Sequence, residues 1–303
     1  MELPKKDRGA VPPVRHIVHF LELIKFSHTI FALPFALISV VLVLNCDDCE
    51  LPQKPVWLSV FWIAVSMAGA RSGAMGFNRL IDRRWDAANP RTADRHSVTG
   101  VIRPPAIVAM IAASFSILIF AAWQLNPLAF RLSPVAIFLV CFYSYTKRFT
   151  NFAHLFLGFA VGAAPVASWI AMTGSISRSA IVLGASVFAW VAGFDILYAL
   201  QDCEFDRKAR LKSIPARFGI STSLAIAKAL HAATLFLWIV LAQIESLGAF
   251  FYLGVAACAL LLIREHNLLK KDDLSKLGIA FFNTNSYIGV TLFVSVLLDR
   301  AIF

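Results

Sequence analysis

The stretch "FWIAVSMAGARSGAMGFNRLIDRRWDAANPRTADR", residues 61–95, changes character halfway along. Residues 61–77 are almost all apolar, whereas residues 78–95 hold three acids, five arginines and two asparagines. An apolar helix of about 20 residues spans the hydrocarbon core of a bilayer. The stretch therefore predicts a membrane-spanning helix that delivers a charged cluster to the membrane surface.

The rest of the chain is also apolar enough for a membrane. Of its 303 residues 59% are hydrophobic and 15% are charged, and the mean hydropathy is +0.72. A soluble domain cannot bury that much apolar surface, and no barrel-type alternation of strands is visible. We therefore predict an all-α polytopic membrane protein with about nine transmembrane helices. The candidate spans are 26–46, 56–78, 104–124, 129–146, 152–173, 179–201, 219–241, 246–264 and 279–299.

The basic residues predict how the chain is oriented. Of the 28 Lys and Arg residues, 22 fall on one side of these spans, and only Lys54, Arg131, Arg178 and Arg300 fall on the other. An excess of Lys and Arg marks the cytoplasmic side. The prediction is an inner-membrane protein with a cytoplasmic tail (1–20), a single transmembrane domain (21–303) and charged loops in the cytoplasm. This topology accounts for the net charge of +10 without a nucleic-acid partner, and no obligate protein partner is indicated.

Cysteine and histidine residues give no strong metal signal. Cys46 and Cys49, in "NCDDCE", lie in the first outward connection, where a local disulfide or a free pair is equally compatible with the sequence. A lone CxxC without further ligands is a poor zinc site. A substrate contact by Lys25 or His28 is left open. The other histidines with no partner at helical spacing are His96, His154, His231 and His266.

The charged cluster belongs to a segment that we call the first motif loop (residues 78–103). Asn78, Asp82 and Asp86 lie four residues apart, so on one helix their oxygens share a face. Such a surface suits Mg²⁺, which often bridges carboxylates to phosphates. Arg71, seven residues before Asn78, lies inside the span, where an arginine needs a polar cavity or a partner. The alternative is a solvated helix end in which the acids only neutralise nearby arginines.

A second motif loop, "DILYALQDCEFDRKARLKSIPARFG" at 195–219, repeats the pattern. Asp195, Tyr198, Asp202 and Asp206 are spaced by three, four and four residues and share a helical face. A purely structural interpretation must invoke the same coincidence twice. Asp195 lies deepest in the membrane, where it suits a base or acceptor for a substrate hydroxyl, or a partner for Arg71 across the bundle.

The two loops together suit a metal and a diphosphate. Mg²⁺ held by acids neutralises charge that builds on a diphosphate leaving group when an allylic C–O bond breaks. The 26 Phe and 7 Trp residues are enough to line a dry pocket around a cationic carbon. A long isoprenoid tail could then lie in the membrane while its diphosphate stays at the surface.

Four segments resemble the UbiA-type aromatic prenyltransferases. "NRLIDRRWDAANPRT" (78–92) is similar to that family's NxxxDxxxD signature, and "YALQDCEFDRKARLKSIPARFG" (198–219) to its DxxxD signature. "KFSHTIFALPFAL" (25–37) and "YSYTKRFTNFAHLFLGFAVGAAPVASW" (143–169) resemble its first and middle segments. The chain departs from the family at "RHSVTG" (95–100), where something nearer "RPLPxG" is expected. The resemblance implies helices around a central cavity that opens near the cytoplasmic face, Mg²⁺, and transfer of a polyprenyl chain to an aromatic ring.

The resemblance also implies a role for each site residue. The expected metal ligands are Asn78, Asp82, Asp86, Asp202 and Asp206. The expected diphosphate contacts are Arg71, Lys147, Arg148, Lys212 and Arg217, although Lys147 and Arg148 could simply be interfacial anchors. The expected acceptor contacts are Asp195, Tyr198 and Arg91. Catalysis would depend on Asp82, Asp195 and Asp202.

The acceptor and the rival functions stay open in the sequence. The second motif loop is most similar to 4-hydroxybenzoate-type enzymes and to their relatives in an alternative menaquinone route. We predict transfer from polyprenyl diphosphate to 4-hydroxybenzoate in quinone biosynthesis. The alternative acceptor is a dihydroxynaphthoate of a menaquinone route. An ion-coupled transporter is the alternative from another class, and it predicts acids near mid-bilayer and internal repeats. A phosphatidyl-type alcohol transferase is disfavoured because no DGxxAR-type signature is present.

Overall fold

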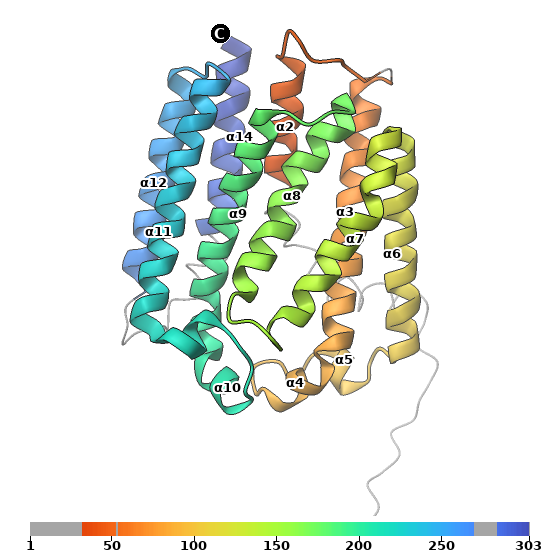
Figure 1. Cartoon of the computed structure of the whole chain (residues 1–303), viewed down its shortest axis with the longest axis vertical. Helices are drawn as coiled ribbons and strands as arrows, with labels where there is room; N and C mark the ends of the chain where they lie inside the picture. Colours follow the sequence, from red (N-terminus) through yellow and green to blue (C-terminus); the bar gives the residue numbers. More distant parts are fainter. Residues whose placement is uncertain (1–31, 53, 270–283, 303) are drawn as a thin grey trace, which may run out of the picture.

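The chain forms a bundle of helices that run along its longest axis (Figure 1). The computed structural model describes residues 32–52, 54–269 and 284–302, and these contain helices and turns but no strand. Eight of the described helices are long and apolar enough to cross a membrane. The first predicted span is represented by a shorter apolar helix, Leu33–Leu44, and residues 26–31 of that span lie outside the described residues. The all-α prediction is confirmed.

The helices match the predicted spans closely. The long helices are α3 (Val56–Ile81), α6 (Pro104–Leu125), α7 (Pro127–Thr146), α8 (Ala153–Thr173), α9 (Arg178–Ala199), α11 (Ile214–Ile244), α12 (Ala249–Leu268) and α14 (Asn285–Ile302). The short ones are α2 (Leu33–Leu44), α4 (Arg83–Ala88), α5 (His96–Thr99), the 3₁₀ turn η2 (Leu200–Asp202) and α10 (Cys203–Lys208). The tail 1–20, Lys25 and His28 lie outside the described residues.

One residue separates α6 from α7, the two least distinct spans in the sequence. The Asn126 side chain accepts a hydrogen bond from the Ala129 N–H at 2.8 Å, and its amide donates to the Ile170 carbonyl of α8 at 2.7 Å. Pro127 occupies the first position of α7. A side-chain cap and an N-terminal proline both favour the start of a new helix. The turn is therefore encoded locally and fixed against α8.

Helices α8 and α9 approach each other through glycine. A Cβ on Gly162 would lie 2.6 Å from the Gly184 carbonyl oxygen, and one on Gly158 would lie 2.6 Å from the Phe188 carbonyl oxygen. Small residues let the backbones of membrane helices pack closely. On its other side α9 packs against α11, where Trp238 is fully buried. Helix α9, which holds Asp195, is therefore fixed from both sides.

A buried polar network joins the C-terminal half of the bundle. The Trp190 indole donates to Asn285 Oδ1 at 3.0 Å, and the Asn285 amide donates to Glu265 Oε1 at 3.0 Å. His231 Nδ1 and His266 Nε2 lie 3.0 Å apart. Polar groups in an apolar interior need such partners. These two histidines therefore find across the α11–α12 interface the partners that helical spacing did not reveal.

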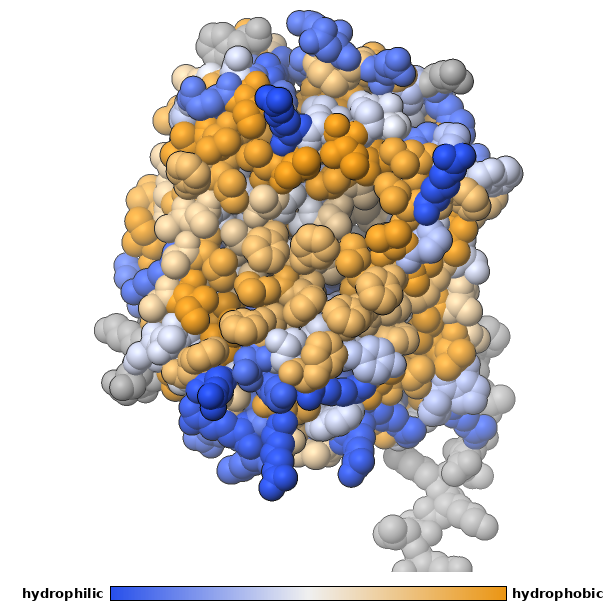
Figure 2. Space-filling view, viewed as in Figure 1, coloured by the Kyte–Doolittle hydropathy of each residue, from blue (hydrophilic) through white to orange (hydrophobic). Residues whose placement is uncertain are grey.

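The surface matches a bilayer. On the face shown in Figure 2, apolar side chains form a broad band across the middle of the bundle, and hydrophilic ones gather toward its two ends. Trp57, Phe61 and Trp123 are exposed, with Trp57 at 71%. Aromatic side chains are common where a protein meets the membrane boundary.

The loop between α2 and α3 contains a disulfide between Cys46 and Cys49. This is one of the two states that the sequence allowed. The loop lies at the end of the bundle opposite to α4 and α10 (Figure 1). Cys203 and Cys258 are buried and donate to backbone carbonyls, as expected of packing residues.

Candidate active site

Both motif loops interrupt their helices at the acids. Helix α3 ends at Ile81, and Asp82 (φ −89°, ψ 2°) separates it from α4. The Asp86 N–H still donates to the Asp82 carbonyl at 2.8 Å, so helical spacing is nearly kept. Helix α9 ends at Ala199 and continues through η2 into α10. The prediction that the acids of each loop lie on one helix is wrong in this detail, because each helix is interrupted where its apolar span gives way to charged residues.

The five predicted acids of the two loops nevertheless line one cavity of about 340 Å³. It lies at the end of the bundle where α4 and α10 are found (Figure 1). Eleven of the predicted site residues line it, namely Arg71, Asn78, Asp82, Asp86, Arg91, Lys147, Arg148, Asp195, Tyr198, Asp202 and Asp206. Residues more than 100 positions apart in the sequence thus share one chamber.

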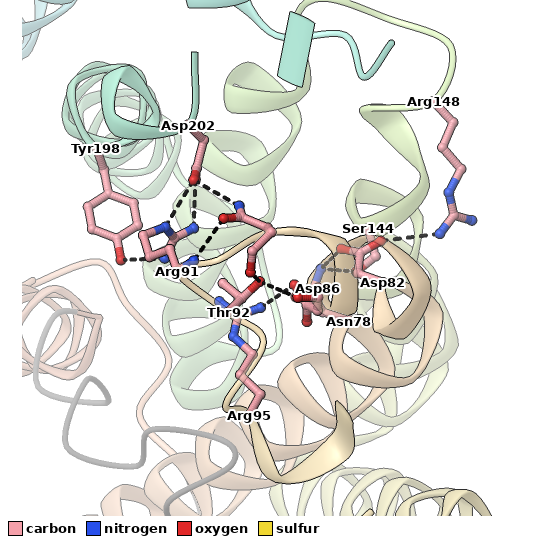
Figure 3. Close-up of polar contacts among 11 residues, drawn as sticks. Asn78, Asp82, Asp86, Arg91, Thr92, Arg95, Ser144, Arg148, Tyr198 and Asp202 are labelled. Carbon is pink, nitrogen blue, oxygen red and sulfur yellow. Dashed lines mark hydrogen bonds and ion pairs between the residues drawn. The ribbon is translucent and has the colours of Figure 1, made fainter. Parts of the chain in front are cut away.

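Arginines neutralise three of the acids (Figure 3). Arg91 binds Asp202 through two hydrogen bonds of 2.6 and 2.9 Å, and this pair joins the two motif loops directly. Arg95 donates to Asp86 at 2.6 Å. Two-pronged arginine contacts of this kind suit carboxylates and phosphates equally. An anionic ligand could therefore bind these guanidinium groups in place of the carboxylates.

Arg148 makes the third pair and is also stacked. Its Nη2 lies 3.2 Å from Asp82 Oδ1, and its guanidinium lies 4.5 Å from the centre of the Trp85 ring and 4.8 Å from that of Tyr145. Stacking on two aromatic rings restricts the guanidinium. On the other side of Asp82, the Asn78 amide donates to Oδ2 at 2.9 Å. Arg148 is thus a cavity residue and not merely an interfacial anchor.

The electrostatics of the cavity keep its cations charged. Burial and the neighbouring Asp86 raise the pKa of Asp82, although Lys147 and Arg148 oppose the shift. Burial acts to lower the pKa of Arg91 and that of Lys147, but nearby carboxylates raise both overall. For Arg91 the carboxylate is chiefly Asp202. An anion that enters the cavity therefore meets positive charges at Arg91 and Lys147.

Two carboxylate oxygens in the cavity suit a hard cation. Asp86 Oδ2 and Asp206 Oδ2 are buried without a hydrogen-bond partner, and these residues are only 8% and 2% exposed. An unpaired buried carboxylate oxygen is costly, and oxygen ligands are what Mg²⁺ prefers. Among the described residues no group of three or more His, Cys, Asp or Glu side chains is arranged to hold a metal as it stands. The unpaired oxygens of Asp86 and Asp206 therefore fit Mg²⁺ in their chemistry, although the acids of the described residues are not gathered around one metal position.

Two predicted residues do not line the cavity. Lys212 is exposed and donates from Nζ to the Phe149 carbonyl at 3.0 Å, and Arg217 is exposed in the first turn of α11. The Lys212 N–H also donates to the Lys147 carbonyl at 2.8 Å, which ties the loop before α11 to the end of α7. A diphosphate contact by either residue stays a prediction, and it requires this loop to move.

The structure adds residues that sequence spacing missed. Asn89 donates to Asp202 at 3.1 Å, and Tyr143 and Arg79 line the cavity. His154 of α8 is fully buried, and its Nδ1 lies 2.6 Å from Asp195 Oδ2. The partner of Asp195 is therefore this histidine and not Arg71. Spacing along one helix cannot reveal a contact between two helices.

An apolar pocket of about 160 Å³ lies beside the cavity. Ala70, Val140 and Ala160 line the pocket, and Arg71, Tyr143 and Val161 line the cavity, so α3, α7 and α8 contribute neighbouring residues to both. The pocket wall is rich in alanine and contains few polar side chains. The site therefore combines a charged chamber with an adjoining apolar one.

A membrane bundle with these two chambers suits a ligand that has an anionic head and an apolar tail. The profile of the UbiA prenyltransferase family matches residues 49–287. The chain belongs to this family and is a prenyltransferase. The family prediction is confirmed.

Relatives with known names and structures agree with this assignment. The chain is 31% identical to a 4-hydroxybenzoate octaprenyltransferase of Marinobacter nauticus, over 76% of this chain and 78% of the relative. It is 32% identical to one of Methylobacillus flagellatus, over 80% and 83%. The apo structure of a UbiA homolog from Aeropyrum pernix K1 has a TM-score of 0.80 and 31% identity, covering 90% of this chain and 98% of that one. A UbiA homolog from Archaeoglobus fulgidus bound to DMAPP and Mg²⁺ shares the fold, with a TM-score of 0.70 and 20% identity over 94% and 100%.

Proposed function

We propose that this enzyme transfers a polyprenyl chain from polyprenyl diphosphate to 4-hydroxybenzoate in a Mg²⁺-dependent reaction of quinone biosynthesis. The observation that supports it best is the joining of two acidic motif loops in one cavity with fixed cations and an adjoining apolar pocket. Relatives about 30% identical are named for the same acceptor.

The metal ligands in this proposal are Asn78, Asp82, Asp86, Asp202 and Asp206. When bound there, Mg²⁺ neutralises charge on the diphosphate as the allylic C–O bond breaks. The unpartnered oxygens of Asp86 and Asp206 support its placement. A structure of the same fold was solved with DMAPP and Mg²⁺.

The diphosphate contacts in this proposal are Arg71, Lys147 and Arg148. Arg91 and Arg95 stand in ion pairs with acids that a metal would claim, so substrate binding exchanges partners. With Mg²⁺ bound, Asp202 and Asp86 would hold the metal, and Arg91 and Arg95 would be available to bind anionic groups of the substrates. This exchange keeps the charges paired in a buried site, where an unpaired charge would be costly.

The acceptor is activated by Asp195 in this mechanism. Its carboxylate takes the proton of the acceptor hydroxyl, with Tyr198 and Arg91 beside the ring. The electron-rich ring carbon forms a bond to the allylic carbon, whose C–O electron pair leaves with the diphosphate, and the ring then loses its own proton. The isoprenoid tail extends into the apolar pocket, whose few polar side chains leave little to hold water near the cationic carbon.

The membrane orientation follows the same proposal. The disulfide between Cys46 and Cys49 lies at the end of the bundle opposite to the site. Disulfides persist in oxidising compartments, whereas the cytoplasm keeps thiols reduced. Together with the positive-inside pattern, this supports a site that faces the cytoplasm across the inner membrane.

The test is transfer of radiolabelled geranyl or farnesyl diphosphate in membranes, with 4-hydroxybenzoate and 1,4-dihydroxynaphthoate offered side by side. Label on 4-hydroxybenzoate supports the proposal, and it should vanish with EDTA and return with Mg²⁺. Label on the dihydroxynaphthoate alone overturns the acceptor and indicates a menaquinone route. If neither acceptor is labelled and no diphosphate is released, the proposed reaction is wrong.

A further inference from the structure

Asp195 contacts a buried histidine that has no role in the reaction proposed above. His154 has no exposed surface, and its Nδ1 lies 2.6 Å from Asp195 Oδ2. The Asp195 side chain is 22% exposed and lines the cavity. The two residues come from α8 and α9, which glycine packing brings close together. The close approach of these helices therefore helps to set the distance between the two side chains.

The environment of His154 assigns its proton. Nε2 is buried and has no hydrogen-bond partner. An unpaired acceptor in an apolar interior is tolerated better than an unpaired N–H donor, especially one on a charged ring. The geometry therefore places the hydrogen on Nδ1, and this N–H donates to the Asp195 carboxylate.

We propose that His154 is a positioning residue for the acceptor reaction, an inference that rests on the proposed function of Asp195. The histidine occupies Oδ2 and fixes the plane of the carboxylate. The other oxygen, Oδ1, is left to accept the proton of the acceptor hydroxyl.

A competing cation explains why the carboxylate needs an anchor. Lys147 lines the same cavity and interacts with the charge of Asp195. Without a partner on α8, Asp195 would rotate toward this ammonium and present neither oxygen to the acceptor. Hydrogen bonds that orient a catalytic carboxylate act on the geometry of proton transfer, so they affect the acceptor step and not diphosphate binding.

Two amide variants separate a positioning role from a packing role. His154→Asn places an N–H donor close to the position of Nδ1, whereas His154→Gln places it one bond farther, near Nε2. Both introduce a polar amide at the same buried site, so they should lower the free energy of unfolding by similar amounts. We expect kcat with 4-hydroxybenzoate to fall less than about threefold in His154→Asn and by about 10- to 100-fold in His154→Gln. The KM for prenyl diphosphate should stay within about twofold in both, because that substrate is bound elsewhere.

A double mutant tests whether His154 acts through Asp195. Adding His154→Gln to Asp195→Asn should lower kcat no further than Asp195→Asn alone, because the positioned group is already gone. A fluorinated 4-hydroxybenzoate with its prenylation position free should narrow the gap between wild type and His154→Gln, since a more acidic hydroxyl depends less on its base. If His154→Gln only disturbed packing, its loss would add to that of Asp195→Asn, and the fluorinated acceptor would not narrow the gap to wild type.

Equal activity of His154→Gln and His154→Asn overturns the proposal, as does an additive loss in the double mutant. A parallel rise in the KM for prenyl diphosphate also overturns it. These outcomes all presuppose a wild-type enzyme that transfers label to the aromatic acid. If the wild-type enzyme transfers none, the proposed function has failed instead, and the two failures are distinguishable.

Discussion

Asp202→Asn tests whether the paired acids form a metal site or only an ion-pair network. Asp202 is 7% exposed and accepts two hydrogen bonds from Arg91 and one from Asn89, at 2.6, 2.9 and 3.1 Å. Asparagine keeps the shape of the side chain and one acceptor oxygen but removes the charge. A structural role and a catalytic role therefore predict losses of different size.

The structural loss should be small. A hydrogen bond to a charged group contributes about 1.5–3 kcal/mol to stability. The Arg91 side chain is 34% exposed, so solvent screening reduces the loss in free energy of unfolding to about 1 kcal/mol. The catalytic loss should be larger, because removing one group that stabilises charge in a transition state costs about 3–4 kcal/mol. Transfer should therefore fall by about 10²–10³-fold.

The assay is prenyl transfer in proteoliposomes across a Mg²⁺ titration, alongside thermal unfolding in detergent. The matched control is Glu204→Gln, because Glu204 lies between Asp202 and Asp206, is exposed and does not line the cavity. Asp202→Asn should also need more Mg²⁺ for its remaining activity. Transfer within about threefold of wild type at saturating Mg²⁺, or an equal loss in Glu204→Gln, would refute the metal assignment.

Three further outcomes are expected. Arg148→Lys keeps the charge but loses the planar group stacked on Trp85 and Tyr145. The KM for prenyl diphosphate should therefore rise about tenfold, with little change in the KM for the acceptor. The control Arg131→Lys, at the other end of α7, should change neither KM. Because the pKa of Asp82 is raised, a proton competes with Mg²⁺ for this carboxylate at a higher pH than for an ordinary carboxyl. The Mg²⁺ concentration for half-maximal transfer should therefore increase as the pH falls through that pKa. A pH profile without this increase contradicts the assignment of Asp82 as a metal ligand. Gly162→Ala adds a Cβ 2.6 Å from the Gly184 carbonyl oxygen. It should lower the free energy of unfolding by about 1–3 kcal/mol, which is measured as a lower Tm. An unchanged Tm would mean that α8 and α9 separate easily.

The sequence was sufficient for the membrane class, for nearly all helix positions and for most of the predicted residues that line the cavity. Apolar runs of bilayer length identify spans because the hydrocarbon core demands them, and this requirement is local. The acids at spacings of four residues were also visible, since a helix places such positions on one side. Even the weakly marked turn at Asn126 was encoded by its own cap and the proline after it.

Only the tertiary structure decided which charges meet. The pairs Arg91–Asp202 and His154–Asp195 join residues 111 and 41 positions apart, and no periodicity along one helix reports them. The exposure of Lys212 and Arg217 likewise depends on how the loop before α11 is tied to the end of α7. The sequence by itself determined which groups reach the membrane surface, because helix length and polarity are properties of one segment. Their partners depend on packing between segments, which the close approach of α8 and α9 at glycine fixes in three dimensions.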